Sequence, residues 1–254
     1  SLAGNNFLGL WDLSPLTNLR TLDLAHNNLS DLNGLPQMRF LQTLNLAGNS
    51  QLQLMDVSFY TATLSMKHLD LSHIPMGESF SFSDLFFIPP LSLATLNLTD
   101  TDITNLWGID SYPAIREIYL SGNDLVLLDG LNLINTLEVL DVSYNEFLEA
   151  SSVKGVLTEN RAIEGLGLAG LPFDIEDVLG SVREPIRLAS LNVSYTHVDN
   201  FTFLQLFHEF KNLAAAGTKL QGLQGIDILT GLESLNLSGV DVDNWLPLES
   251  IETL

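Results

Sequence analysis

The stretch Leu19-Arg-Thr-Leu22-Asp-Leu24-Ala-His-Asn27-Asn-Leu29 places leucines at a fixed spacing, with an asparagine two positions before the last of them. The same spacing recurs along the whole chain in steps of 22 to 27 residues. A repeat of this period is typical of solenoids, in which each repeat packs only on its neighbours. The stretch therefore predicts a stacked array and not a domain with a fold-defined active site.

Each repeat contains one short predicted strand. A buried apolar residue is followed two positions later by a second one, as expected for a strand with one face in the core. Ten parallel strands of this kind would stack about 4.8 Å apart. The first buried residues of the ten strands are Leu22, Leu44, Leu69, Leu96, Ile118, Leu140, Leu166, Leu191, Leu213 and Leu235.

A polar residue follows most of these strands. Where it is Asn27, Asn49, Asn123 or Asn145, the side-chain amide can bond backbone groups that a tight turn leaves unpaired, so we expect a structural role. Six other turns must close by other bonds. They carry Thr101, Thr196, Thr218, Ile74, Leu171 and Val240 at this position.

The segments that return to the next strand have a second pattern. Apolar residues every three positions over 103–115 and 220–232 predict 3₁₀ helices. Residues 151–157 and 174–180 predict short α-helical turns with serine or acidic starts. We expect the irregular segment 75–92 to form an aromatic plug under a convex loop, in preference to a partner-binding wedge. Its aromatic and proline residues are Phe80, Phe82, Phe86, Phe87, Pro89 and Pro90.

The recurring motif resembles the leucine-rich repeat family, in particular the 22-residue subtype of the phosphatase regulator SDS22 and the bacterial internalins. The resemblance covers residues 1–254 and implies one α/β solenoid of about ten full repeats plus partial repeats at both ends. It implies an arc with a parallel sheet on the concave face and 3₁₀ or short α-helices on the convex side. Neither end carries a polar cap, so we expect a segment of a longer chain with further domains at both ends.

The charge balance limits the partners. The chain has 31 acidic and 10 basic residues, and its net charge of -21 argues against nucleic acid and against an anionic membrane surface. A cationic, neutral or calcium-bridged partner is expected instead. The chain also lacks a run of about 20 apolar residues that could insert into a membrane. It has no cysteine, which leaves the compartment open, whereas its few charges favour an extracellular or cell-surface location over a cytoplasmic one.

The outward residues of the strands are expected to form a concave binding face. A ladder of Asp and Asn beside a ladder of small residues could hydrogen-bond an extended partner, although the repeat consensus accounts for both ladders by default. The first ladder is Asp23, Asn45, Asp70, Asn97, Tyr119, Asp141, Gly167, Asn192, Ala214 and Asn236; the second is Ala25, Ala47, Ser72, Thr99, Ser121, Ser143, Ala169, Ser194, Ala216 and Ser238.

One repeat interrupts these ladders with glycines and gives the best candidate site. Tyr144 and Tyr195 flank it at the same register, about 10 Å apart, so we expect a shallow slot of bare backbone between two rings. Such a slot could hold an apolar side chain, a proline or a sugar ring. The alternative is that the glycines relieve crowding and the tyrosines cover the edge. The predicted ligand-binding residues are Tyr119, Asp141, Tyr144, Gly165, Gly167, Gly170, Asn192 and Tyr195.

Catalytic and metal-binding patterns are weak. His68, Asp70 and His73 form a histidine–carboxylate cluster, but outward residues two apart on a strand lie about 6.5 Å from each other, which favours a solvated edge over a metal site. The acidic turns 100–102 and 241–243 lack the glycine-containing loop of a dedicated calcium site, and calcium binding there stays open. We therefore predict a non-enzyme without a cofactor.

The function predicted from these observations is recognition or adhesion. The module would bind a protein or a glycan through its concave face, as part of a larger bacterial cell-surface or secreted protein. Two alternatives remain open. One is an intracellular protein-interaction scaffold of the SDS22 kind, and the other is a structural spacer in a giant surface protein.

Overall fold

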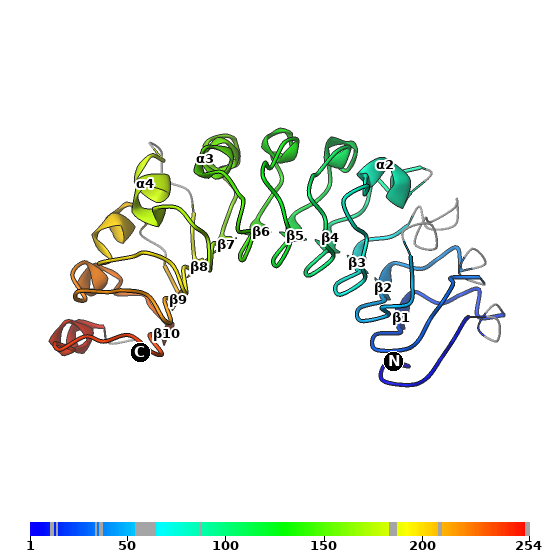
Figure 1. Cartoon of the computed structure of the whole chain (residues 1–254), viewed down its shortest axis with the longest axis horizontal. Helices are drawn as coiled ribbons and strands as arrows, with labels where there is room; N and C mark the ends of the chain where they lie inside the picture. The colour runs from blue at the N-terminus through cyan, green and yellow to red at the C-terminus, as the bar shows by residue number, and fades with distance from the viewer. Residues whose placement is uncertain are drawn as a thin grey trace.

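The protein is described by a computed structural model in which the chain forms an arc (Figure 1). One parallel sheet lines the inner side of the arc, while helices and loops form the outer side. The sheet has ten strands in the order of the sequence, β1 to β10. The structure describes residues 1–10, 13, 15–33, 35, 38–53, 65–86, 88–182, 187–207 and 210–251.

Every strand has three residues and carries the predicted apolar residue at its centre. The register is uniform, because Leu22 lies opposite Leu44, and the same pairing of central residues continues to Leu213 and Leu235. All ten predicted strands are therefore confirmed. The strands are β1 Thr21–Asp23, β2 Thr43–Asn45, β3 His68–Asp70, β4 Thr95–Asn97, β5 Glu117–Tyr119, β6 Val139–Asp141, β7 Gly165–Gly167, β8 Ser190–Asn192, β9 Asn212–Ala214 and β10 Ser234–Asn236.

The outer side is built from short helices, as the spacing predicts. The 3₁₀ helices η3 and η6 fall in the two segments that have apolar residues every three positions. The α-helices are α2 Phe82–Leu85, α3 Ala150–Glu159 and α4 Ile175–Gly180. The described 3₁₀ helices are η3 Ile109–Ser111, η4 Leu131–Leu133, η5 Thr202–Leu206, η6 Ile226–Ile228 and η7 Leu246–Ser250.

The two predicted helix starts have different outcomes. The side chain of Asp174 accepts a hydrogen bond from the Asp177 backbone N–H at 3.1 Å, which confirms the acidic start of α4. The serine start of α3 is wrong by one residue, because the helix begins at Ala150 without a side-chain cap. The hydroxyl of Ser152 instead accepts from the backbone N–H of Leu128 on the preceding repeat, at 2.7 Å.

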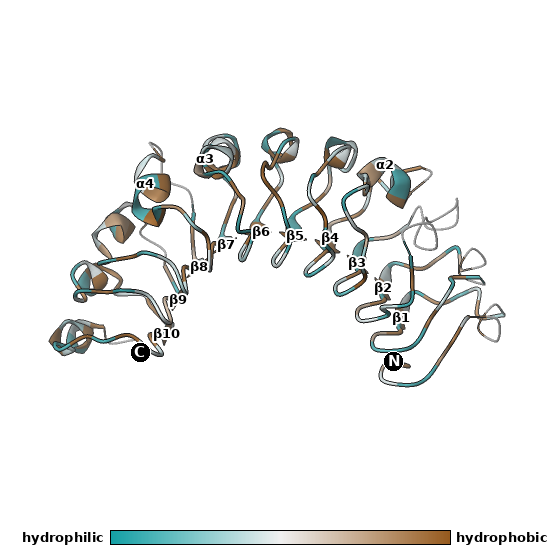
Figure 2. Ribbon diagram, viewed as in Figure 1, coloured by the Kyte–Doolittle hydropathy of each residue, from teal (hydrophilic) through white to brown (hydrophobic). Residues whose placement is uncertain are grey.

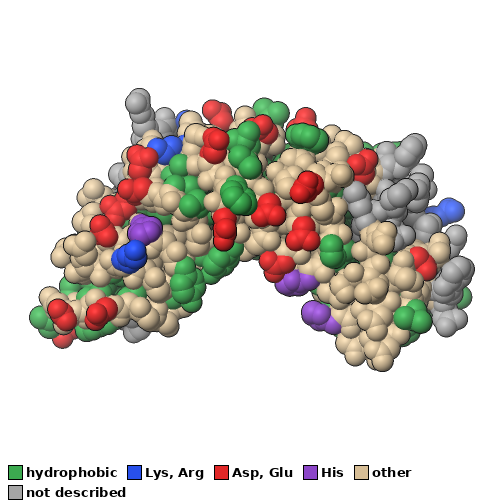
Figure 3. Space-filling view, in the orientation of Figure 1, with side chains coloured by type: hydrophobic (Ala, Val, Ile, Leu, Met, Phe, Trp, Pro, Cys, Tyr) green, Lys and Arg blue, Asp and Glu red, His purple; other side chains and the backbone are tan. Residues whose placement is uncertain are grey.

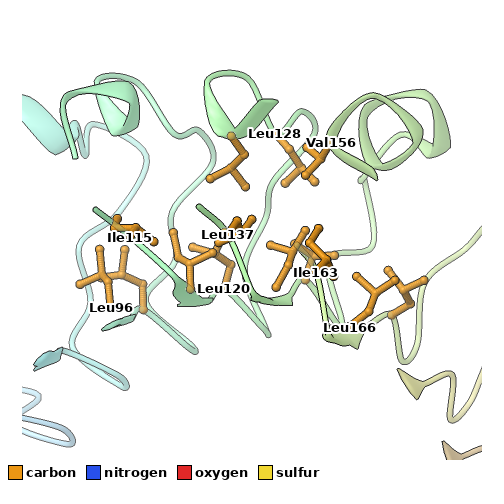
Figure 4. Packing of buried hydrophobic residues seen from close by; sticks show 14 of the residues in the cluster. Leu96, Ile115, Leu120, Leu128, Leu137, Val156, Ile163 and Leu166 are labelled. Atoms are coloured by element: carbon orange, nitrogen blue, oxygen red, sulfur yellow. The ribbon is translucent and has the colours of Figure 1, made fainter. Parts of the chain in front are cut away.

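A continuous hydrophobic core fills the space between the sheet and the outer side. Each repeat contributes the same apolar positions, and brown apolar segments recur in every repeat (Figure 2). In the middle of the arc, Leu96 of β4, Leu120 just after β5 and Leu166 of β7 lie in one core with residues of the outer side, such as Leu128 and Val156 (Figure 4). Each fully buried aliphatic side chain stabilises the fold by about 2 kcal/mol, so the stacked repeats hold together without disulfides.

The predicted aromatic plug is confirmed in the residues that the structure describes. The ring of Phe82 packs edge-on against Phe80 and Tyr112, with centroids 5.0 and 5.8 Å away. The Tyr112 hydroxyl donates to the carbonyl of Phe82 at 2.7 Å, and burial raises the pKa of this phenol. The ring centroid of Phe86 lies 6.1 Å from that of Tyr112. Phe87 lies outside the described residues.

The asparagines after the strands form a buried ladder. Asn145 donates to the carbonyls of Val142 in its own repeat and Leu120 in the preceding one, at 2.9 and 3.0 Å, and accepts from the N–H of Leu125. Asn27, Asn49 and Asn123 make equivalent bonds. The predicted structural role is therefore confirmed. In three repeats a threonine hydroxyl donates instead to the carbonyl of the residue that follows the strand, at Thr101, Thr196 and Thr218.

Candidate functional site

The residue just before the asparagine ladder has left-handed backbone in every repeat, with φ between 53° and 73°. In every repeat except the one that contains Gly239, the N–H of this residue donates to a carbonyl of the next repeat, as from Tyr144 N to Ala169 O at 2.7 Å, and this bond fixes its position. Glycine adopts this conformation freely, whereas a bulky side chain in it is an outlier. We call these residues the turn ledge. They are Gly4, His26, Gly48, His73, Asp100, Gly122, Tyr144, Gly170, Tyr195, Gly217 and Gly239.

Side chains on the turn ledge lie over the glycine of the following repeat. A Cβ atom at Gly170 would be 2.5 Å from Cδ1 of Tyr144, and one at Gly217 would be 2.6 Å from Cδ1 of Tyr195. His26 and Asp100 likewise fill the space over the glycines that follow them. His73 has no glycine after it, and its Nδ1 lies 3.2 Å from Oδ2 of Asp100 instead. A side chain on the ledge thus needs either a glycine or a polar partner on the next repeat.

The two ledge tyrosines are close to each other. Their ring centroids are 6.5 Å apart with a 42° tilt, and 46% of Tyr144 and 63% of Tyr195 are exposed. The predicted slot between them is wrong in its geometry, because the ring of Tyr144 occupies the space above Gly170. The left-handed backbone at Tyr144 directs its ring over Gly170 of the next repeat, so the ring does not form one side of an open slot.

The glycines of β7 are covered by the side chains of β6. A Cβ at Gly167 would lie 2.1 Å from Oδ1 of Asp141, and one at Gly165 would lie 3.3 Å from a methyl group of Val139. Gly167 is buried. These contacts support the alternative interpretation, in which the glycines relieve crowding, and they remove the predicted stretch of bare backbone.

The Asp and Asn ladder on the strands has a structural role as well. Oδ1 of Asp141 accepts from the N–H of Ser143 at 3.0 Å, and Oδ1 of Asn192 accepts from that of Ser194 at 3.1 Å. The same bond forms on β1, β2, β3, β4 and β10. Where β7 has glycine in place of Asp or Asn, the hydroxyl of Ser143 accepts from Ala169 N instead. The carboxylate of Asp141 therefore caps the backbone of its own repeat and covers Gly167 of the next one.

The second ladder of small residues is buried in most repeats, so most of its members are not exposed for hydrogen bonding to an extended partner as predicted. It lies where each chain leaves the strand and begins the ledge turn, and the neighbouring repeats cover it. The buried members are Ala25, Ala47, Ser72, Ser143, Ala169, Ser194 and Ala216.

Tyr119, Asp141, Tyr144 and Tyr195 form what we call the tyrosine strip, which runs across β5 to β8. Burial raises the pKa of Tyr144, and the neighbouring Tyr195 and the charge of Asp141 raise it further. Burial also raises the pKa of Tyr119, with Glu117 and then Asp141 adding to the effect. The hydroxyl of Tyr119 donates to Oε2 of Glu117 at 3.4 Å. Carboxylates thus give the strip a negative potential. Of the other predicted site residues, Asn192 lies on β8 beside the strip.

The sequence did not identify the exposed apolar side chains beyond the ledge. Phe147 is 62% exposed because Leu148 takes the buried position of its repeat, one residue later than in the Asn27-x-Leu29 motif. This extra residue after the asparagine is the signal that could have revealed it. Val126 on the preceding repeat is also exposed, and its carbonyl accepts from the N–H of Glu149 at 3.0 Å.

Within the described ranges, no group of three or more histidine, cysteine or acidic residues could hold a metal ion. Nδ1 of His68 pairs with the hydroxyl of Thr95 at 3.0 Å, while His73 faces Asp100. Oδ1 of Asp70 accepts from the N–H and hydroxyl of Ser72. The three members of the predicted histidine–carboxylate cluster therefore have separate neighbours.

In the part of the chain that the structure describes, no helix combines the length and the apolar content needed to cross a bilayer.

Comparison with known proteins gives a sequence match and a fold match. Residues 17–76 match the family model described as leucine rich repeats (2 copies). The CD180 antigen of Mus musculus is 30% identical over 154 residues, which cover 58% of this chain and 23% of that protein. The chain spans less than a quarter of the length of each curated relative that it matches here.

Two solved structures illustrate the fold match. An internalin from Listeria monocytogenes is 16% identical with a TM-score of 0.68, over 96% of this chain and 75% of that one. A TLR13–ssRNA13 complex is 21% identical with a TM-score of 0.74, over 95% of this chain and 36% of that one. Together with the ten-stranded sheet and its buried asparagine ladder, these likenesses identify the fold of this chain as a leucine-rich repeat solenoid.

Proposed function

We propose that this solenoid is a non-catalytic recognition module that binds a protein partner through the tyrosine strip on β5 to β8. One observation carries the proposal. Tyr144 and Tyr195 have left-handed backbone and remain largely exposed, at a position where six other repeats carry glycine. The fold does not require a ring there.

The energetics of the ledge support a functional role for these rings. A bulky residue in left-handed backbone costs about 1 to 2 kcal/mol relative to glycine. A ring that stays about half exposed recovers only part of that amount by burial. A side chain that is both unfavourable for the backbone and exposed to solvent is a candidate for binding, and tyrosine is enriched in the binding hot spots of protein interfaces.

The surroundings of the strip favour a protein partner. Concave surfaces of repeat proteins offer extended binding faces, and tyrosine combines a large apolar ring with a polar hydroxyl. A glycan is the second ligand class that such rings accept. Nucleic acid is disfavoured in this proposal, because the net charge of -21 would repel its phosphates.

The proposal includes a cell-surface or secreted location in a bacterium. It is supported by the four lysines among 254 residues and by the likeness of the fold to an internalin. Protease treatment of intact source cells, with a cytosolic marker as the lysis control, tests the location. Release of peptides from this chain without the marker is expected. Release only after lysis would contradict the proposal and would favour the intracellular scaffold.

The binding role is tested by capture of partners on the immobilised chain, followed by identification of the bound proteins. The Tyr144→Leu/Tyr195→Leu variant should lose a stoichiometric partner. Trp107→Leu is the matched control, since Trp107 is an exposed aromatic residue on the outer side, and it should retain the partner. An unchanged partner profile in the tyrosine variant would overturn the proposal.

A further inference from the structure

The geometry of the tyrosine pair suits a planar cation. The ring centroids of Tyr144 and Tyr195 are 6.5 Å apart, and both rings are substantially exposed. A cation within about 6 Å of a tyrosine ring is attracted by the negative face of the π-system. One group bound beside both rings would therefore interact with two aromatic systems at once.

The charged strand residues near the pair are acidic, whereas His197 and Lys219 follow the ledge turns at Tyr195 and Gly217. No residue of β1 to β10 is lysine or arginine, whereas β5 and β6 contribute the carboxylates of Glu117 and Asp141. The exposed residues Asp124 and Glu146 follow the ledge turns of the same two repeats. Acidic side chains gather over the middle of the arc, with hydrophobic side chains among them (Figure 3).

Two basic residues on the repeats of β5 and β6 have acidic partners. Arg116, which precedes β5, pairs with Glu138. Lys154 in α3 lies 2.7 Å from Asp177. The carboxylate of Asp141 lies close enough to the tyrosine strip to raise the pKa of both Tyr119 and Tyr144.

A sugar fits this environment less well than a cation. Sugar sites orient several hydroxyls with polar side chains, and the bonds from backbone N–H groups to Oδ1 of Asp141 and Oδ1 of Asn192 reduce the number of polar atoms left for this purpose. A cation needs only the ring faces and the negative potential. Guanidinium is planar, weakly hydrated and able to stack on aromatic rings, whereas the lysine ammonium is compact and strongly hydrated.

We infer that the partner presents an arginine, whose guanidinium packs against the Tyr144 and Tyr195 rings while the carboxylate of Asp141 balances its charge. This inference rests on the proposed function and specifies its partner as a basic protein segment. The rings supply shape selectivity, and the carboxylates supply attraction over a longer range.

Isothermal titration calorimetry with octaarginine, octalysine and maltoheptaose tests the inference at physiological salt, which screens general attraction between exposed charges. Octaarginine should bind more tightly than octalysine, and maltoheptaose should not bind. The Tyr144→Leu/Tyr195→Leu variant, which keeps the net charge, should bind octaarginine about tenfold more weakly.

Two aspartates on the strands provide a matched pair of charge variants. Asp141→Asn should weaken octaarginine binding several-fold, whereas Asp70→Asn should leave it unchanged. Both substitutions remove one charge, and both aspartates cap a serine N–H on their own repeat. Equal effects of the two substitutions, or equal affinity of the parent and the tyrosine variant, would reduce the binding to general charge attraction and overturn the inference. Maltoheptaose binding that depends on the tyrosines would overturn it in favour of a glycan.

The same variants separate this inference from the proposed function. If the captured partner is lost in the tyrosine variant while octaarginine binding is unaffected, the binding surface stands and the arginine inference fails. If both the partner and octaarginine bind the tyrosine variant normally, the proposed function fails as well.

Discussion

Tyr144 and Asn145 are neighbours in the sequence, yet they are subject to different constraints. Asn145 is fully buried and bonds three carbonyls and one N–H across two repeats, so the backbone determines its chemistry. Tyr144 is about half exposed, and the main requirement at its position is space over the next glycine. The turn ledge can therefore vary between glycine, histidine, aspartate and tyrosine along one arc. The comparison teaches that adjacent columns of a repeat can divide folding and recognition between them.

The largest expected effect is the loss of stability when the buried Asn145 is replaced. Asn145→Ala leaves the N–H of Leu125 and the carbonyls of Val142 and Leu120 without their partner, so the free energy of unfolding should fall by about 2 to 4 kcal/mol. Urea denaturation followed by circular dichroism measures it. Asn28→Ala, at an exposed neighbour of Asn27, should change stability by less than about 0.5 kcal/mol. Similar losses of unfolding free energy in both variants would contradict the assignment of a folding role to the buried asparagines.

The next prediction tests the requirement that a large side chain on the turn ledge has a glycine on the following repeat. Gly170→Ala places a methyl group against the Tyr144 ring in addition to straining the backbone, and it should cost about 2 to 3 kcal/mol. Gly4→Ala has the same left-handed φ but no atom within 4 Å, so it should cost only about 1 kcal/mol. The difference should vanish when Gly170→Ala is combined with Tyr144→Gly. Equal costs in the parent background would show that the ring does not lie over Gly170.

A smaller effect concerns the ionisation of Tyr144 on the turn ledge. The phenol of Tyr144 should titrate above its usual pKa because of burial, Tyr195 and Asp141. The folded state then holds this proton more firmly than the unfolded chain. The associated stability is fully present below pH of about 10 and is lost as the pH rises through the folded pKa. NMR titration of labelled tyrosine measures the shift. Asp141→Asn should bring the pKa of Tyr144 closer to its usual value, and an unchanged pKa would place the carboxylate too far away to act.

The repeated parts of the molecule could be predicted from the sequence. Leu22 and Leu235 belong to one register, and each repeat confirms its neighbours, so ten strands and a buried asparagine ladder followed directly. The aromatic plug around Phe82 was also predictable, because apolar rings in a long convex segment must find a core.

The ledge was not predictable in the same way. The spacing of apolar residues shows which side chains are buried, but it does not show that the chain turns through left-handed backbone at Tyr144. That turn directs the ring over Gly170 and closes the expected slot. The signal was present in the alternation of glycine with larger residues at one repeat position, from Gly4 to Gly239. The burial of small residues such as Ala169 follows from the same turn.

The most direct test of the central claim is the free energy of unfolding of Tyr144→Gly/Tyr195→Gly, measured by urea denaturation. Each substitution relieves about 1 kcal/mol of left-handed strain and loses a similar amount of ring burial. If the tyrosines serve recognition, the variant should remain within about 1 kcal/mol of the parent chain. A loss of about 3 kcal/mol or more would show that the rings hold the fold together, and it would contradict the account.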